Sequence, residues 1–221
     1  SVAFKGETLA AQLASRGKDA LRAIQMIYQM PDVALNPKQK VREVIGRPLE
    51  FYLGLKGEQK AKRIVQLLEQ IELPADYADR YPNQLSGGEK QRVCIARALA
   101  AEPDLIICDE VTSALDQLVA EGILELLQNL QNELGVSYLF ITHDLATVKA
   151  IADSIVVMYR GHIVEQGEKE AILAPPHAAY TELLLSSVPE MDPDWLDGLV
   201  EKRRRGELPT VASLNAQTAI T

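Results

Sequence analysis

Two short apolar runs, separated by one long amphipathic segment, organise the middle of the chain. Residues 105–108 and 137–142 carry almost continuous apolar side chains, which is typical of strands buried inside a sheet. Between them, apolar residues recur at helical spacing through residues 123–130. A strand, a helix and a second strand in this order predict a βαβ unit, and therefore a parallel sheet.

Helical spacing dominates the part of the chain before this unit. Residues 37–79 show two amphipathic faces separated by Gly54 and Gly57, and a further helix is predicted after residues 86–88, stopping before Pro103. The apolar positions of the two faces are Val41, Val44 and Ile45, then Ile64, Leu67, Leu68 and Ile71. The pattern predicts a helical insertion in front of the βαβ unit.

Apolar and polar residues alternate near both ends of the chain, and Gly or turn residues bound the alternating runs. Such runs are typical of half-buried strands. Near the N-terminus, a strand over residues 2–7 and a second strand over 24–28 are predicted, with a basic amphipathic segment between them that is either helix or loop. Towards the C-terminus, the predicted elements are a helix over 146–151, a β-hairpin over 154–167 and a last helix over 180–187. The tail from about residue 189 is rich in proline and charge, so we expect it to be loosely packed.

Composition and charge narrow the class of protein. The chain is 47% hydrophobic and 24% charged, which argues for a globular protein. Acidic residues outnumber basic ones by 31 to 23, so nucleic acid is not an expected partner. No apolar stretch reaches the roughly 18 to 20 residues of a membrane span. Cys94 and Cys108 lie in apolar surroundings without metal-ligand spacing, which predicts two buried thiols.

The first candidate for chemistry is the pair Gly87 and Gly88, which follows Ser86 at the start of a predicted helix. Backbone N–H groups and the helix dipole at such a start face any anion placed there, which predicts a phosphate-binding turn. Taken alone, the same string is also typical of an ordinary helix N-cap with a flexible turn.

A second candidate is the pair of carboxylates, Asp109 and Glu110, that ends the first buried strand. Ligands of open α/β sheets bind at this edge, and in phosphoryl transfer one acid holds Mg²⁺ while a neighbouring group orients or deprotonates the attacking water. We assign Asp109 to the metal and Glu110 to the water. A strand that simply ends in a solvated acidic pair is the alternative. His143 ends the second buried strand, where a lone histidine is usually structural.

Five strings in one order resemble the ATP-binding cassette (ABC) family of transporter ATPases. They are the Q-loop glutamine Gln29, the signature over residues 85–89, the Walker B run over 105–110, the D-loop over 113–116 and the switch histidine His143. Glu89 stands where the signature more usually has Gln. The resemblance implies an α/β fold: a P-loop NTPase-type parallel sheet core with an α-helical signature subdomain and a C-terminal β-ribbon. We expect the boundaries at residues 1–36 (nucleotide-binding core up to the Q-loop), 37–100 (helical subdomain), 101–188 (α/β core) and 189–221 (tail).

The resemblance also implies roles for residues. It gives Glu110 and His143 the catalytic roles, with His143 contacting the γ-phosphate, and Gln29 a place beside Asp109 on Mg²⁺. The residues implied to bind ATP held by a second cassette are Ser86, Gly87, Gly88 and Asp116. His162 and His177 match no catalytic element, and we expect both at surface or turn positions.

As a function, the resemblance implies an ATP-hydrolysing motor subunit that uses ATP and Mg²⁺, pairs with a second cassette and drives a transmembrane permease from the cytoplasmic face of the inner or plasma membrane. The strings at residues 34–37 and 176–184 look like those of importers of peptides, nickel or opines, although Ala178 stands where Pro is usual. A soluble ABC ATPase of translation or DNA repair, and a non-catalytic ABC-like binding module, stay open as alternatives.

The Walker A string, Gly-x4-Gly-Lys-Ser/Thr, does not occur in the chain, whose only Gly-Lys pair is Gly17-Lys18 followed by Asp19. That loop cradles phosphates through charge-assisted hydrogen bonds of about 1.5 to 3 kcal/mol each. We therefore expect an N-terminally truncated cassette that, by itself, binds nucleotide weakly and does not turn over ATP. An incomplete sheet exposes strand edges, so we also expect self-association.

Overall fold

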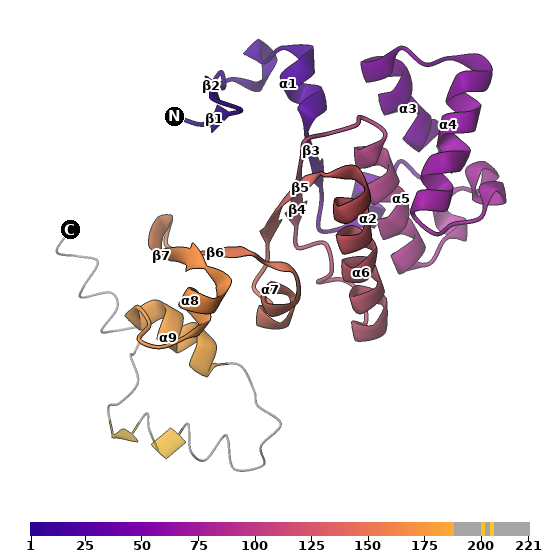
Figure 1. Ribbon diagram of the computed structural model, residues 1–221. Helices are drawn as coiled ribbons and strands as arrows, with labels where there is room; N and C mark the ends of the chain where they lie inside the picture. Colours follow the sequence, from indigo (N-terminus) through magenta and orange to yellow (C-terminus); the bar gives the residue numbers. More distant parts are fainter. Residues whose placement is uncertain (188–199, 202–203, 206–221) are drawn as a thin grey trace. The chain divides into compact units, whose positions relative to one another are not determined.

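The computed structural model describes residues 1–187, 200–201 and 204–205 (Figure 1). The chain divides into two compact units, Ser1–His143 and Asp144–Thr221. Apart from four positions, the predicted loosely packed tail lies outside the described residues. None of the described helices combines the length and the apolar character that a bilayer span requires.

A three-stranded parallel sheet forms the centre of the first unit. Its strands are β3 (Ile24–Ile27), β4 (Leu105–Asp109) and β5 (Ser137–Ile141), in the order β3-β4-β5. The helix α6 (Gln117–Leu134) links β4 to β5. The predicted βαβ unit and the parallel sheet are therefore confirmed.

The two faces of this sheet differ in burial. Ile106 and Cys108 of β4 are fully buried on one face, together with Ile27 of β3. Leu139 and Ile141 of β5 lie on the other face and are 51% and 48% exposed. The expectation that β5 is a buried strand is thus wrong for these positions, because the described elements cover this face of the sheet only in part at β5.

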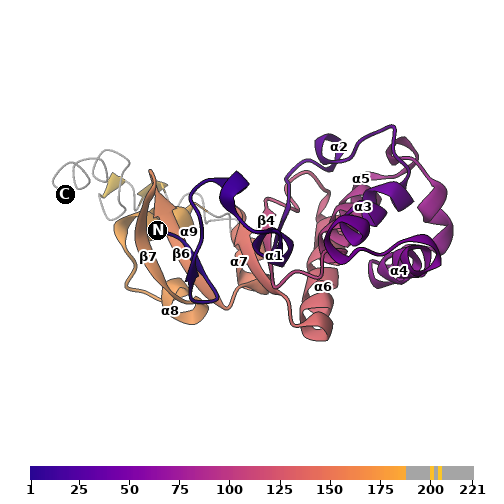
Figure 2. The ribbon, with the colours of Figure 1, turned by 90° about the horizontal axis from the view of Figure 1, so that it is seen from above.

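Helices fill the stretch between β3 and β4, as predicted. They are α3 (Val41–Leu53), α4 (Gly57–Gln70) and α5 (Gly87–Leu99), and α3 and α4 pack side by side (Figure 2). All seven predicted apolar positions on α3, α4 and the residue after α4 are buried. Gly54 ends α3 with φ +70°, a left-handed conformation that glycine adopts without steric cost.

Several short elements escaped prediction because they are too short to show a period. They are the 3-10 helices η2 (Ala75–Asp79) and η3 (Pro82–Gln84), and the helices α2 (Pro31–Ala34) and α8 (Lys169–Leu173). The 3-10 helix η1 (Leu13–Ser15) and the helix α1 (Lys18–Ala23) lie in the segment predicted as helix or loop. At the N-terminus, the predicted single strand is instead a small antiparallel hairpin, β1 (Ala3–Phe4) and β2 (Glu7–Thr8). Lys5 and Gly6 turn the chain there with positive φ angles of 51° and 82°.

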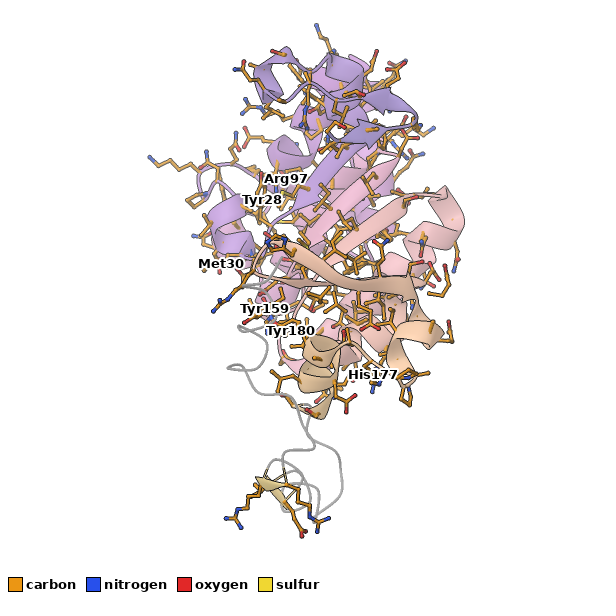
Figure 3. The ribbon with its side chains drawn as sticks, turned by 90° about the vertical axis from the view of Figure 1, so that its left-hand side faces the viewer. Tyr28, Met30, Arg97, Tyr159, His177 and Tyr180 are labelled. Atoms are coloured by element: carbon orange, nitrogen blue, oxygen red, sulfur yellow. The ribbon has the colours of Figure 1, made fainter. Side chains whose placement is uncertain are left out.

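The second unit contains the predicted helices and β-ribbon. Its elements are α7 (Leu145–Ile151), β6 (Ser154–Tyr159), β7 (His162–Glu168), α8 and α9 (Ala179–Ser186), with β6 and β7 antiparallel. The rings of Tyr159 and Tyr180 stack with centroids 4.4 Å apart (Figure 3).

His177 contradicts its prediction as a surface or turn residue, because its side chain is only 8% exposed. The physical reason is the anchoring of the following residue, since the Ala178 N–H donates to the Glu165 carboxylate at 3.2 Å and holds this segment against β7. His162 is exposed, as predicted.

Candidate functional site

Three predicted site residues meet at the carboxyl edge of the parallel sheet. Gln29 follows the end of β3, Glu110 follows β4 and His143 follows β5. Parallel strands bring their carboxyl ends to one edge, so residues that are far apart in sequence become neighbours there. We call Gln29, Glu110 and His143 the Glu110 cluster.

The Glu110 carboxylate is the centre of this cluster. Its Oε2 accepts a hydrogen bond from Gln29 Nε2 at 2.8 Å, and its Oε1 lies 2.9 Å from His143 Nδ1. The Glu110 side chain is 26% exposed and the His143 side chain 76% exposed, so the cluster opens to solvent on the histidine side. Gln29 Nε2 also lies 3.3 Å from Ser113 Oγ. Sequence reasoning placed Ser113 in the D-loop but did not place it at this cluster.

An unusual backbone conformation at Glu110 sets the direction of this carboxylate. Glu110 has a φ of +46°, which is uncommon for a residue with a side chain and costs roughly 1 to 2 kcal/mol. Its N–H donates to the Ile141 carbonyl at 2.9 Å, and its own carbonyl accepts from the Ser113 N–H at 3.1 Å. These bonds hold a strained conformation at the end of β4, which is where strain is commonly found at functional sites.

Asp109 ends β4 and is paired in register with Ile141. No cluster of three or more His, Cys, Asp or Glu side chains that could enclose a metal ion occurs in the part of the chain that the structure describes. The carboxylate of Asp109 and the amide oxygen of Gln29 are nevertheless donor types that suit Mg²⁺, which is usually bound through one or two carboxylates together with phosphate and water. The donor set therefore fits the predicted metal.

The glycine turn, residues 86–88, begins α5 at a second place in the first unit. Ser86 is the N-cap: its Oγ accepts from the Glu89 N–H at 3.3 Å, and its own N–H donates to Glu89 Oε2 at 2.7 Å. This capping box uses the amides of Ser86 and Glu89. The amides of Gly87 and Gly88, in the first turn of α5, are among those that a helix cannot satisfy internally.

Close packing explains the second glycine. A Cβ on Gly88 would lie 2.6 Å from Val119 Cγ1, which leaves no space for a side chain, whereas a Cβ on Gly87 would lie 3.6 Å from Leu115 Cδ2. Both neighbours flank Asp116, whose carboxylate caps α6 by accepting from the Val119 N–H at 3.1 Å. The two glycines of the turn thus pack against residues on either side of Asp116.

The two free cysteines take no part in acid–base or nucleophilic chemistry. Both are buried, as predicted. Burial raises the pKa of the Cys94 thiol to about 11 and that of the Cys108 thiol to about 12. Both thiols are therefore protonated at neutral pH and are poor nucleophiles.

Comparison with known proteins defines the class. Residues 1–113 match the family described as ABC transporter, and residues 164–216 match the oligopeptide/dipeptide transporter C-terminal region. The chain therefore belongs to the ABC transporter family, as the five sequence motifs indicated.

Individual members of this family are also similar to the chain. The chain is 40% identical over 207 residues to the dipeptide transport ATP-binding protein DppF of Escherichia coli (strain K12), covering 94% of this chain and 61% of DppF. The ATP-binding cassette MJ0796, in a dimer bound to ADP and Pi, is 35% identical over 66% of this chain and 64% of its own, with a TM-score of 0.57. CbiO1 from Clostridium perfringens, part of the transporter complex cbiONQ, is 25% identical over 90% and 75% respectively, with a TM-score of 0.69. The chain thus spans about three fifths of the length of DppF.

Proposed function

We propose that this chain belongs to the ATP-hydrolysing subunit of an importer for peptides or chemically related solutes, and supplies its Q-loop, signature, Walker B and switch residues. Because the chain carries no Walker A string, ATP turnover is proposed for a cassette that has this loop and not for the chain by itself. The observation that carries the proposal is the Glu110 cluster, because it joins an acid, an amide and an imidazole at the ligand edge of the sheet in a member of the ABC transporter family. The match of residues 164–216 to a peptide transporter region favours import over a soluble, non-transport ABC ATPase.

In this proposal, Glu110 is the catalytic base. Its carboxylate orients the attacking water and takes its proton as the γ-phosphate is transferred. His143, mostly exposed, contacts the γ-phosphate, and its bond to Glu110 Oε1 fixes the direction of the carboxylate. Asp109 and Gln29 would hold Mg²⁺, which would neutralise charge on the phosphates.

The glycine turn and Asp116 act on nucleotide held by a second cassette. The amides of Gly87 and Gly88 and the Ser86 hydroxyl proton supply the hydrogen-bond donors, and the start of α5 supplies a favourable dipole. The dimer of MJ0796 with ADP and Pi supports a paired arrangement. The remaining proposed partner is a membrane permease, which the subunit contacts from the cytoplasmic face.

The substitution Glu110→Gln tests the catalytic assignment in a cassette that contains a Walker A loop, assembled with its permease and reconstituted in lipid vesicles. A glutamine keeps the size and can still bond to Gln29 and His143, but it cannot accept the proton from water. We expect ATP hydrolysis to fall at least about 100-fold while ATP binding persists. Glu121→Gln is the matched control, because Glu121 lies exposed on α6 and, among the described residues, its side chain accepts a hydrogen bond only from Gln117 at 3.2 Å.

Hydrolysis at the wild-type rate in Glu110→Gln would refute the role of this residue. Vesicles that hydrolyse ATP but take up no peptide in any ATP-dependent manner would instead refute the importer assignment. These two results are independent of each other.

A further inference from the structure

A tyrosine from outside the predicted motifs contacts the glycine turn through a carboxylate. Tyr77, in η2, donates its phenolic O–H to Glu89 Oε1 at 2.6 Å. The other oxygen of the same carboxylate, Oε2, accepts from the Ser86 N–H at 2.7 Å. Glu89 therefore bridges η2 and the residue that begins the turn.

The Tyr77 ring is itself held on its other side. The guanidinium of Arg80 lies 3.5 Å from the ring centroid, and Arg80 is fixed by a hydrogen bond to Asp76 at 3.0 Å. A cation over an aromatic face is an attractive arrangement. Four side chains in a row, Asp76, Arg80, Tyr77 and Glu89, thus lead to the Ser86 amide.

The carboxylate in this row carries a negative charge. The hydrogen bond from Tyr77 lowers the pKa of Glu89, and the bond from the Ser86 amide lowers it further. Conversely, the hydrogen bond to Glu89 raises the pKa of the Tyr77 phenol. At neutral pH Glu89 is therefore ionised and Tyr77 is protonated, which makes this a charge-assisted hydrogen bond.

The negative charge of Glu89 lies close to the proposed phosphate-binding amides, so the orientation of its carboxylate matters. Glu89 is the third residue of α5 and directly follows Gly87 and Gly88, whose amides are proposed to bind phosphate. A freely moving carboxylate there would repel phosphate and compete for the same donors. Both oxygens of the carboxylate are engaged, one by the Tyr77 hydroxyl and one by the Ser86 N–H, and neither is bonded to the amides of Gly87 or Gly88 in the described part of the chain.

We propose that Tyr77 is a positioning residue for the glycine turn: its phenol fixes the Glu89 carboxylate on the Ser86 amide, which orders the turn and keeps the negative charge off the phosphate-binding donors. The proposal rests on the proposed function, since it assumes that the turn binds nucleotide phosphate. It further implies that Tyr77 matters because residue 89 is an acid, and not for general stability.

The test is the kinetics of ATP hydrolysis by the assembled transporter with Tyr77→Phe. This change removes one hydroxyl and keeps the ring that Arg80 covers. We expect the KM for ATP to rise about 3- to 10-fold with kcat nearly unchanged, because the change weakens nucleotide binding and leaves the Glu110 cluster intact. Tyr81→Phe is the matched control: Tyr81 is 39% exposed, and its hydroxyl makes no hydrogen bond within the described part of the chain.

Making the Tyr77→Phe substitution in a Glu89→Gln variant distinguishes a positioning role of Tyr77 from a general effect on stability. In Glu89→Gln the residue is neutral and its amide oxygen can still accept from Ser86, so adding Tyr77→Phe should change KM less than about 2-fold. An equal rise in KM in both backgrounds, or a loss of folded protein in both, would overturn the positioning role. An unchanged KM in Tyr77→Phe alone would overturn it as well. If the wild-type transporter hydrolyses no ATP, the proposed function itself fails, and that outcome is visible before any variant is made.

Discussion

Replacing Gly88 by alanine examines how tightly the glycine turn packs on α6. The added methyl group would lie 2.6 Å from Val119 Cγ1, whereas carbon atoms in contact prefer about 3.5 to 4.0 Å. Valine in a helix strongly prefers one rotamer, so Val119 cannot turn its methyl group aside without cost. Either the start of α5 or α6 must move.

The expected magnitude follows from two opposing effects. Overpacking at a well-packed contact costs about 1 to 3 kcal/mol. Alanine is a better helix former than glycine, which returns at most about 1 kcal/mol. We therefore expect Gly88→Ala to lower the free energy of unfolding by about 1 to 2 kcal/mol.

Urea unfolding of the purified chain measures this change. With a slope of about 2 kcal/mol per molar urea, the midpoint should fall by about 0.5 to 1 M. Gly87→Ala is the matched control, because its Cβ would lie at an ordinary 3.6 Å from Leu115 Cδ2 and the midpoint should stay unchanged or rise slightly. In a Val119→Ala background the clashing methyl group is gone, so Gly88→Ala should no longer destabilise.

Two results would refute this reasoning. One is an equal midpoint for Gly87→Ala and Gly88→Ala. The other is a full loss of stability from Gly88→Ala even when residue 119 is alanine, since the cost would then come from the backbone of the turn and not from its contact with α6.

Two further predictions concern stability. Arg97 of α5 donates to the Ala34 carbonyl at 2.6 Å in a partly buried contact, so Arg97→Met should lower the free energy of unfolding, measured in urea, by about 1.5 to 3 kcal/mol. The control Arg63→Met breaks an ion pair with Glu102 at 3.6 Å and should lower it by only about 0 to 1 kcal/mol. Equal losses of stability in the two variants would contradict the role of burial. Because the pKa values of Cys94 and Cys108 are raised from 9.0 to about 11 and 12, the folded state holds more protons than the unfolded state above pH 9, and stability should fall as the pH rises through 9 to 11. The double substitution to alanine should flatten this part of a stability–pH curve, and an unchanged slope would show that other groups cause it.

Local patterns predicted much of the fold correctly. The strands β4 and β5 are visible in the sequence as apolar runs, and the helices α3, α4 and α6 as apolar residues at helical spacing, because burial imposes a pattern on consecutive residues. A single strand is predicted where the structure has the hairpin that turns at Lys5 and Gly6, because strands of two residues are too short to show an alternating pattern of their own. The half-exposed face of β5 could not be predicted either, because it depends on which elements cover the sheet and not on the strand itself.

In the candidate site, too, some features could be predicted from the sequence and others could not. The positions of Gln29, Glu110 and His143 at one sheet edge follow from motif order and parallel topology, and the structure brings them together. Their roles as site residues stay predictions. The bond between Tyr77 and Glu89 had no signal in the sequence, because Tyr77 belongs to a short 3-10 helix and its partner is chosen by tertiary packing.

The helix caps at Ser86 and Asp116 have a consequence for mutational scanning. Each side chain caps the N-terminus of a helix, α5 or α6, and each is also proposed to reach nucleotide. Alanine at either position removes about 1 kcal/mol of capping energy together with any contact to ligand, so loss of transport in a selection would mix folding with function. Substitutions that retain a capping oxygen, Ser86→Asn and Asp116→Asn, keep the fold and remove only the hydroxyl or the charge. In a saturation library, the gap between alanine and asparagine at these two positions therefore reports how much of each phenotype is folding.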